Sequence, residues 1–208
     1  VTALQGAIGS AGLRGITDLI PAYADLTVCY DCTVISAKAL QRQLRRLLDS
    51  LSVAGQDRRR VFQLPACYGG DYGPDLDFVC HHSGLSAQEV IELHSAPDYL
   101  IYMLGFLPGF AYLGGLDPRL HTPRLDSPRT CIPAGSVGIG GAQTGVYPLA
   151  SPGGWQLLGR TPVSVFDRQR QEPILYRAGD LVHFVPISPA EYEKIARACL
   201  LYTSDAAD

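Results

Sequence analysis

Residues 133–160, PAGSVGIGGAQTGVYPLASPGGWQLLGR, limit most strongly what this chain can fold into. The stretch contains eight glycines and three prolines, and Arg160 is its one charged residue. Such a stretch could form a phosphate cradle, a flexible linker or a set of tight turns that line a pocket. Apolar residues such as Val137, Ile139 and Trp155 are too frequent for a solvated linker. The stretch therefore predicts tight turns between short buried strands.

The glycines of this stretch fit neither common phosphate-binding motif. In a dinucleotide fingerprint, Gly138-Ile-Gly140 would be followed by a third glycine at the position of Gln143. A P-loop needs a lysine, and there is none between residues 39 and 193. Two interpretations remain open: the glycines form barrel corners only, or they let backbone N–H groups approach a ligand.

The surrounding sequence, from residue 98 to 187, consists of short apolar runs separated by Gly and Pro. Such a pattern predicts a β-barrel or sandwich, with strands at 161–166, 173–176 and 181–187 and a hairpin turn at RAGD. Residues 99–116 are eighteen uncharged residues, which approaches the length of a membrane span. Their glycines and proline would break a helix, so we expect a buried strand–turn–strand segment instead.

The N-terminal part of the chain has a different pattern. We expect a helix over residues 1–14, a strand over 25–31 and a helix capped by Ser36 with one leucine stripe. The sequence GQDRRR at 55–60 is a link to the next domain, and apolar periodicity is lost near the C-terminus. The predicted division is an α+β domain over 1–60, a β-barrel domain over 61–199 and a disordered or foreign tail over 200–208.

Composition restricts the class of partner. A net charge of −3 gives no electrostatic signature for nucleic acid or an anionic membrane. The six cysteines are irregularly spaced, and Cys29-x-x-Cys32 lacks the second ligand pair of a structural zinc site. We therefore expect ordinary reduced cysteines, a cytoplasmic protein, no membrane or nucleic-acid partner and no bound metal.

Two groups of residues could carry chemistry. His94 ends a helix that opens with a capping box at Ser86–Glu89, and histidine can exchange protons near neutral pH. Arg119, Arg124 and Arg129 each follow a proline at five-residue intervals. A rigid backbone could hold these guanidinium groups for a carboxylate or phosphate, but a solvated loop fits equally well. The serine-hydrolase elbow and the zincin motif are both missing from the sequence.

Residues 102–162, with CYGGDYGPDL at 67–76 and SGLSAQEVIELHSAPDY at 83–99, resemble a known family. It is the carboxyltransferase/allophanate hydrolase subunit 1 family, whose members include KipI and one of the subunits of 5-oxoprolinase. AGDLVHFVPISPAEY at 178–192 extends the resemblance. It implies an α+β fold: a small ferredoxin-like N-terminal domain, truncated at its start, followed by a cyclophilin-like β-barrel domain.

The resemblance also implies a function. Family members of the 5-oxoprolinase type hydrolyse 5-oxoproline to glutamate at the expense of ATP, with Mg²⁺. The implied partners are a homologous larger, KipA-like protein (the C subunit) and a third component that is similar to the A subunit; alone, the chain would be inactive. Two alternatives share the same motifs: a KipI-like inhibitor of a sporulation histidine kinase, and a carboxyltransferase or allophanate hydrolase-related subunit of urea metabolism.

By position in the matched motifs, His94, Arg124 and Gln143 are the candidate catalytic residues. Arg124 and the backbone N–H groups of 135–145 would stabilise phosphate charge, His94 would shuttle a proton near neutral pH, and Gln143 would bind a substrate amide. The other matched positions form a predicted substrate or ATP pocket, or a subunit interface: Pro133, Gly135, Thr144, Gly145, Tyr147, Pro148, Ser151, Gly153, Gly154, Trp155 and Arg160.

Overall fold

The computed structural model describes residues 1–22, 25–51 and 59–204. The chain divides into two compact units, Val1–Arg59 and Arg60–Asp208. Most of the predicted link at 55–60 lies outside the described residues, which resume at Arg59. Each unit is described separately below.

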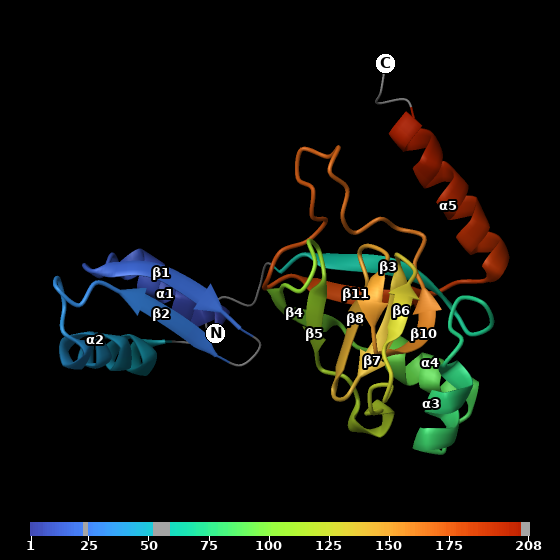
Figure 1. Ribbon diagram of the computed structural model, residues 1–208, viewed down its shortest axis with the longest axis horizontal. Helices are drawn as coiled ribbons and strands as arrows, with labels where there is room; N and C mark the ends of the chain where they lie inside the picture. Colours follow the sequence, from blue (N-terminus) through green and yellow to red (C-terminus); the bar gives the residue numbers. More distant parts are fainter. Residues whose placement is uncertain (23–24, 52–58, 205–208) are drawn as a thin grey trace. The chain divides into compact units, whose positions relative to one another are not determined.

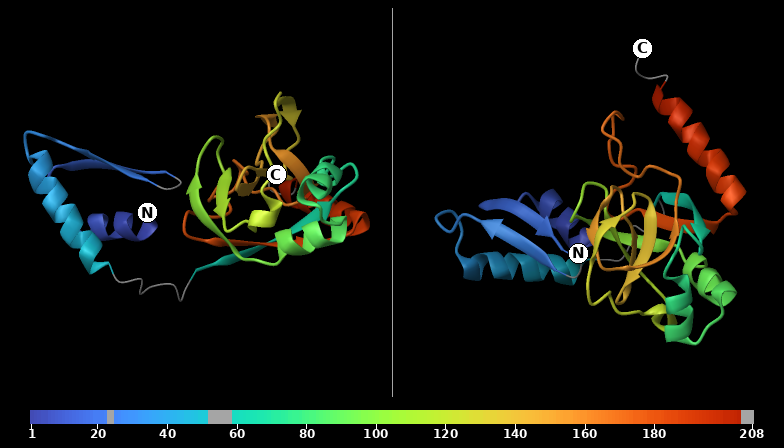
Figure 2. Two further views of the ribbon diagram at one scale, coloured as in Figure 1. Left: turned by 90° about the horizontal axis from the view of Figure 1, so that it is seen from below. Right: turned by 45° about the vertical axis from the view of Figure 1, so that its right-hand side comes forward.

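The first unit pairs two helices with a two-stranded ribbon. Its elements are α1 (Thr2–Ala11), β1 (Ile16–Pro21), β2 (Leu26–Tyr30) and α2 (Ala37–Ser50). β1 and β2 are antiparallel, and both helices lie on the same side of the ribbon (Figure 2). The Ser36 side chain accepts a hydrogen bond from the Ala39 amide, which confirms the predicted cap. β1 was not predicted, because its exposed and half-buried residues do not alternate regularly.

The second unit is built on a closed barrel of seven strands (Figure 1). The order around the barrel is β10-β3-β11-β4-β5-β8-β7. β3 and β11 are parallel and the other neighbours antiparallel, so the barrel is mixed. The strands are β3 (Val61–Tyr68), β4 (Tyr99–Leu104), β5 (Ala111–Gly114), β7 (Ser136–Gly140), β8 (Gln143–Val146), β10 (Gln156–Arg160) and β11 (Leu181–Pro186).

Alternate side chains of these strands fill the barrel. Val137 and Ile139 of β7 point inward with Leu64, Leu158 and Phe184, and all five are buried. Helices α3 (Leu76–Ser83) and α4 (Ala87–Ser95) lie side by side against the barrel (Figure 1). The capping box that opens α4 is present, as predicted, and the left-handed Gly84 ends α3.

A second, smaller core lies outside the barrel wall. The ribbon of β6 (Arg129–Ile132) and β9 (Ser151–Gly153) covers this core, which contains Phe110, Ile132, Tyr147, Trp155 and Leu157. The glycines of the 133–160 stretch make room for it. A Cβ at Gly140 would overlap the Trp155 indole, and a Cβ at Gly145 would lie 2.8 Å from the Ala111 carbonyl oxygen. The close approach of Trp155 to the wall therefore requires glycine at these positions.

The segment between β10 and β11 differs from the prediction. Residues 161–166 and 173–176 are not strands, and only an isolated bridge links Phe166 to Ile174. Pro162 and Pro173 cannot donate to a sheet, and the segment instead buries Val165 and Tyr176 against the barrel core. RAGD forms a turn closed by the Asp180 amide and the Arg177 carbonyl oxygen, but it does not join two paired strands.

The remaining elements are a short 3₁₀ helix, η1 (Pro118–Leu120), and α5 (Pro189–Ser204). Glu191 and Ser188 cap the N-terminus of α5, which projects from the barrel in Figure 1. Residues 200–204 of the predicted tail are helical, and 205–208 lie outside the described residues. Residues 99–116 form β4, a loop and β5, which confirms the strand–turn–strand prediction. Among the described residues, no helix is long and apolar enough to cross a membrane.

Candidate functional site

An aromatic cluster on the outer wall of the barrel gathers several of the predicted site residues. Trp155 and Tyr147 are 4% and 2% exposed, and both contact Phe110 edge-on at centroid distances of 5.4 and 5.2 Å. The Arg124 guanidinium carbon lies 5.7 Å from the centre of the Trp155 ring. This cation–π contact holds an exposed cation in one place. The arrangement presents a fixed positive charge over an apolar floor.

The Tyr147 hydroxyl experiences opposing influences. Burial raises its pKa, while the Trp155 backbone N–H and the charges of Arg124 and Arg129 act to lower it. Two guanidinium groups therefore act on the same hydroxyl from two neighbouring segments. A phosphate or carboxylate bound near Tyr147 would gain from the same charges.

Arg129 is held by an ion pair that the sequence did not reveal. Its Nη2 lies 2.6 Å from Asp75 Oδ1, and Asp75 Oδ2 accepts the Leu157 amide at 2.6 Å. Arg119, in contrast, pairs with the nearby Asp117. The sequence left open whether Arg119, Arg124 and Arg129 hold a carboxylate or phosphate or lie on a solvated loop, and in the structure each has a different partner. Arg124 alone of the three lies over the aromatic cluster without a carboxylate partner among the described residues.

His94 is buried inside the barrel wall, in a line of hydrogen bonds that runs from Tyr68 through His94 and Thr144 to Gly138. The single Thr144 hydroxyl proton goes to the Gly138 carbonyl oxygen at 3.0 Å, so Thr144 must accept from His94 Nε2–H at 2.8 Å. His94 Nδ1 is then the acceptor for the Tyr68 hydroxyl, also at 2.8 Å. The imidazole is therefore a fixed neutral tautomer that connects α4, β3 and β8.

Burial also controls the charge of His94. Its side chain is inaccessible to solvent, and desolvation lowers its pKa to about 3. At neutral pH the ring carries no charge. The expectation that His94 shuttles protons near neutral pH is contradicted by this environment; its place among the functional residues stays a prediction.

The backbone N–H groups of 135–145 are largely occupied by the barrel itself. β7 is paired on both sides, with β8 and β10. At one end of the strand, the Gly135 amide donates to the Tyr147 carbonyl oxygen at 2.7 Å. At the other end, the Gly141 amide donates to the Thr122 carbonyl oxygen at 2.8 Å. This contradicts the expectation that these N–H groups form a phosphate cradle, since a hydrogen bond within the sheet uses the single proton of each amide.

The predicted set falls into three places. Thr144 lies with His94 inside the barrel, while the neighbouring half-buried Gln143 begins β8 opposite Gly140. Gly135 packs against Thr161 at the far end of β7, where Arg160 pairs with Ser136 across the strands. The outer cluster and its ribbon hold or adjoin the remainder: Arg124, Pro133, Gly145, Tyr147, Pro148, Ser151, Gly153, Gly154 and Trp155.

Sequence reasoning missed three residues that shape the site. Asp75 and Tyr68 both fall in CYGGDYGPDL, which was noted only for its resemblance. Phe110 joins Trp155 to Tyr147 and was noted only as part of an apolar run. In the described part of the chain, no group of three or more His, Cys, Asp or Glu side chains could hold a metal ion.

The sequence and the fold agree with a known protein family. The family described as carboxyltransferase domain, subdomain C and D, matches residues 1–176, and the chain belongs to this family. Two curated relatives carry the name of the 5-oxoprolinase B subunit. The relative from Bacillus subtilis (strain 168) is 45% identical over 188 residues, or 86% of this chain and 78% of the relative. The relative from Escherichia coli O157:H7 is 51% identical over 175 residues, or 84% and 79%. The family resemblance predicted from the sequence is confirmed.

Solved structures with similar sequences share the fold of this chain. A conserved uncharacterized protein from Pyrococcus horikoshii is 45% identical, with a TM-score of 0.63 over 92% of this chain and 88% of that one. The protein TTHA0988 is 41% identical, with a TM-score of 0.72 over 90% of this chain but only 36% of its own. The Kluyveromyces lactis urea amidolyase is 23% identical with a TM-score of 0.72, and this likeness shows the fold alone.

Proposed function

We propose that this chain is the B subunit of an ATP-dependent 5-oxoprolinase, which hydrolyses 5-oxoproline to glutamate. The observation that carries the proposal is the 45–51% identity to two proteins of that name across most of both chains. The proposed partners are a third component similar to the A subunit, and a homologous, larger C subunit. The proposed cosubstrate is ATP with Mg²⁺, and the proposed compartment is the cytoplasm.

We further propose that residues 1–60 are a ferredoxin-like domain, and that 61–199 are a cyclophilin-like barrel. Two strands covered by two helices on one side support the first assignment. A closed barrel with α3 and α4 packed against it supports the second. A barrel of this kind implies no prolyl isomerase activity, since one fold supports many functions.

The outer cluster supports a role in activating the lactam. Hydrolysis of an amide by way of ATP proceeds when the γ-phosphoryl group is transferred to the amide oxygen. Water then adds to the activated carbon, and the C–N bond breaks with protonation of the nitrogen to give γ-glutamyl phosphate. A second water hydrolyses this acyl phosphate to glutamate and phosphate, while ADP remains from the first step. Each step places negative charge on oxygen, which a fixed cation stabilises. Arg124, held over Trp155 and beside Tyr147, is the side chain here best placed to do so.

Gln143 and His94 have different proposed roles. Gln143 is half-buried at the start of β8, and its amide can accept and donate hydrogen bonds to a lactam. His94 is a positioning residue, because its neutral ring holds Thr144, the residue after Gln143. The remaining matched residues of the set shape the pocket or the interface with a partner.

Reconstitution with the partner subunits tests this proposal. We expect 5-oxoproline-dependent ATP hydrolysis by the wild type, and a loss of about tenfold or more in Arg124→Ala and Gln143→Ala. Arg119→Ala is the matched control, because Arg119 pairs with Asp117 away from the cluster. Full activity in both variants would refute the site. Complete absence of 5-oxoproline-dependent hydrolysis in the wild-type complex would refute the function.

The urea-metabolism alternative has weaker support. The Saccharomyces cerevisiae urea amidolyase is 31% identical over 137 residues, which is 60% of this chain and 7% of that protein. Urea-dependent ATP hydrolysis in the same assay would favour it. The kinase-inhibitor alternative predicts that the isolated chain binds and inhibits a histidine kinase.

A further inference from the structure

The loop between β4 and β5 exposes an aromatic ring on a strained backbone. Phe106 is 63% exposed and has a φ of 69°, and it is the one non-glycine residue with positive φ in the described ranges. A left-handed conformation is unfavourable for a bulky residue, and an exposed ring is unfavourable in water. Both costs are incurred at the same position. Strain of this kind persists where the surrounding structure enforces it, and it is common at binding sites.

The loop is held rigidly in this conformation. The Gly105 amide donates to the Phe110 carbonyl oxygen at 3.1 Å. The Leu107 amide donates to the Gly105 carbonyl oxygen at 2.8 Å, and the Phe110 amide donates to the Leu107 carbonyl oxygen at 3.0 Å. From outside the loop, the Tyr176 hydroxyl donates to the Gly109 carbonyl oxygen at 2.9 Å. The Phe106 ring also meets Phe110 edge-on, at a centroid distance of 5.5 Å. The ring is therefore preorganised, which lowers the entropic cost of binding through it.

Phe106 lines one of two hollows that share lining residues. One, of about 320 Å³, is lined by Phe106 and its loop, and the other, of about 390 Å³, lies over residues 171–177. Leu104 and Ile174 line both. We call Phe106 and these two hollows the Phe106 surface.

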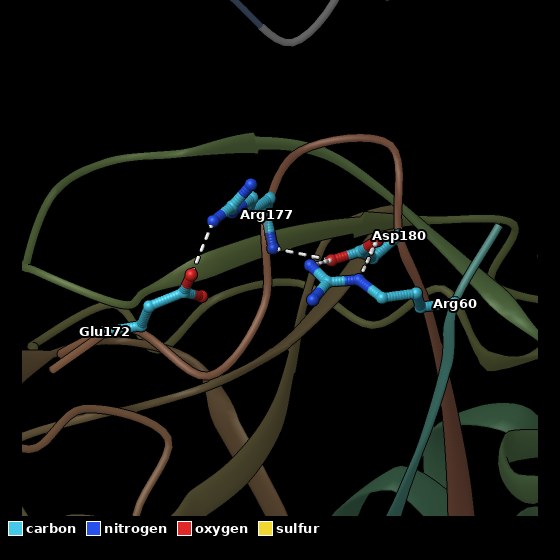
Figure 3. A network of polar contacts seen from close by, with 4 residues as sticks. All are labelled: Arg60, Glu172, Arg177 and Asp180. Carbon is cyan, nitrogen blue, oxygen red and sulfur yellow. Dashed lines mark hydrogen bonds and ion pairs between the residues drawn. The ribbon is translucent and has the colours of Figure 1, made fainter. Parts of the chain in front are cut away.

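The charges around the Phe106 surface neutralise one another. Glu172 pairs with Arg177 at 2.8 Å, and Asp180 pairs with Arg60 at 2.6 Å (Figure 3). The Arg177 amide also donates to Asp180, which ties the two pairs together (Figure 3). The surface thus offers apolar contact with no uncompensated charge. It suits an apolar segment of a protein better than an anionic ligand.

We propose that the Phe106 surface binds the larger subunit of the complex, through apolar side chains of that subunit. This inference rests on the proposed function. The relatives' name as one subunit of 5-oxoprolinase supports another subunit of that enzyme as the occupant. In TTHA0988 a stretch similar to this chain makes up 36% of a single longer chain, so further sequence accompanies this unit there. Separate subunits that act together need a stable interface. Permanent interfaces are the most apolar, and buried aromatic anchors dominate their energetics.

The affinity of the full chain for the larger subunit, measured by calorimetry, tests the surface. Phe106→Gly removes the ring and relieves the positive φ, so we expect affinity to fall about 30-fold while the melting temperature stays the same or rises. Phe106→Asn is a second variant that tolerates the same φ and should show the same loss. Phe106→Tyr keeps the ring and should bind within about threefold of the wild type.

Phe78→Ala is the matched control, since Phe78 is 49% exposed but lies on α3 away from this surface. Unchanged affinity in Phe106→Gly and Phe106→Asn, with a wild type that binds, would overturn the surface and leave the proposed function intact. Loss of activity without loss of binding would identify a small-molecule site and also overturn it. A wild type that neither binds the larger subunit nor hydrolyses ATP with it would overturn both.

Discussion

The two faces of β8 carry polar groups of opposite character. On the inner face, the Thr144 hydroxyl accepts a hydrogen bond from a neutral, fully buried His94 and donates one to the Gly138 carbonyl oxygen. On the outer face, Gly145 leaves space for Trp155, over which the exposed Arg124 lies. The inner groups satisfy one another, so they specify and stabilise the barrel. The outer cation has no carboxylate partner among the described residues and is available to a ligand. Burial therefore indicates a structural role for His94, while the exposure of Arg124 is compatible with the chemical role proposed for it.

The largest expected effect comes from removing the inner group. His94→Ala would leave a cavity and deprive the Tyr68 and Thr144 hydroxyls of their partner. We expect the free energy of unfolding to fall by about 4 kcal/mol, measured by urea denaturation. His81→Ala, on the exposed part of α3, is the control and should change stability by less than about 0.5 kcal/mol. A His94→Ala variant as stable as the control would show that the inner hydrogen bonds do not stabilise the barrel.

We expect the stability of the protein to be sensitive to added side-chain volume on the outer face of the barrel wall. Gly140→Ala would place a methyl group in the Trp155 indole, and we expect a loss of about 2–3 kcal/mol in thermal or urea unfolding. Gly154→Ala is the matched control next to Trp155, because the nearest atom to its Cβ is 3.6 Å away. Equal stability of the two variants would mean that Trp155 moves freely from the wall. The second core would then not be a fixed platform for Arg124.

The local features of the fold could be predicted because their partners lie nearby in the sequence. Ser86 and Glu89 form a box within one helical turn, and Gly84 ends α3 immediately after its last residue. The chain of apolar residues at 99–116 likewise contains both strands and the turn that joins them. At 161–180, alternation alone suggested strands, but prolines and packing over the barrel determined a different structure.

The site was only partly predictable, because its chemistry depends on burial. Asp75 and Arg129 are 54 residues apart in sequence, and no local pattern links them. The family resemblance selected His94, Thr144 and Arg124 as one set, although the wall of the barrel separates the first two from the third. Glycines of 133–160 suggested ligand-binding amides, yet the structure uses them for close packing around Trp155.

The inner face should also give the barrel a measurable pH dependence. The pKa of His94 is about 3 in the folded chain and near its ordinary value of 6.5 when unfolded. Between these values the unfolded chain binds a proton that the folded chain does not, so stability is present above pH 6.5 and lost as the pH falls. From pH 7 to pH 5 this one group should reduce the free energy of unfolding by about 2 kcal/mol.

His94→Gln isolates that contribution, because a glutamine keeps hydrogen-bonding capacity but does not titrate. We expect its urea midpoint to change less between about pH 7 and pH 5 than that of the wild type, with carboxylate effects common to both. Parallel pH profiles for the two proteins would show that His94 takes up protons in the folded state. In that event the inner ring would be open to solvent, and the separation of a structural inner face from a chemical outer face would fail.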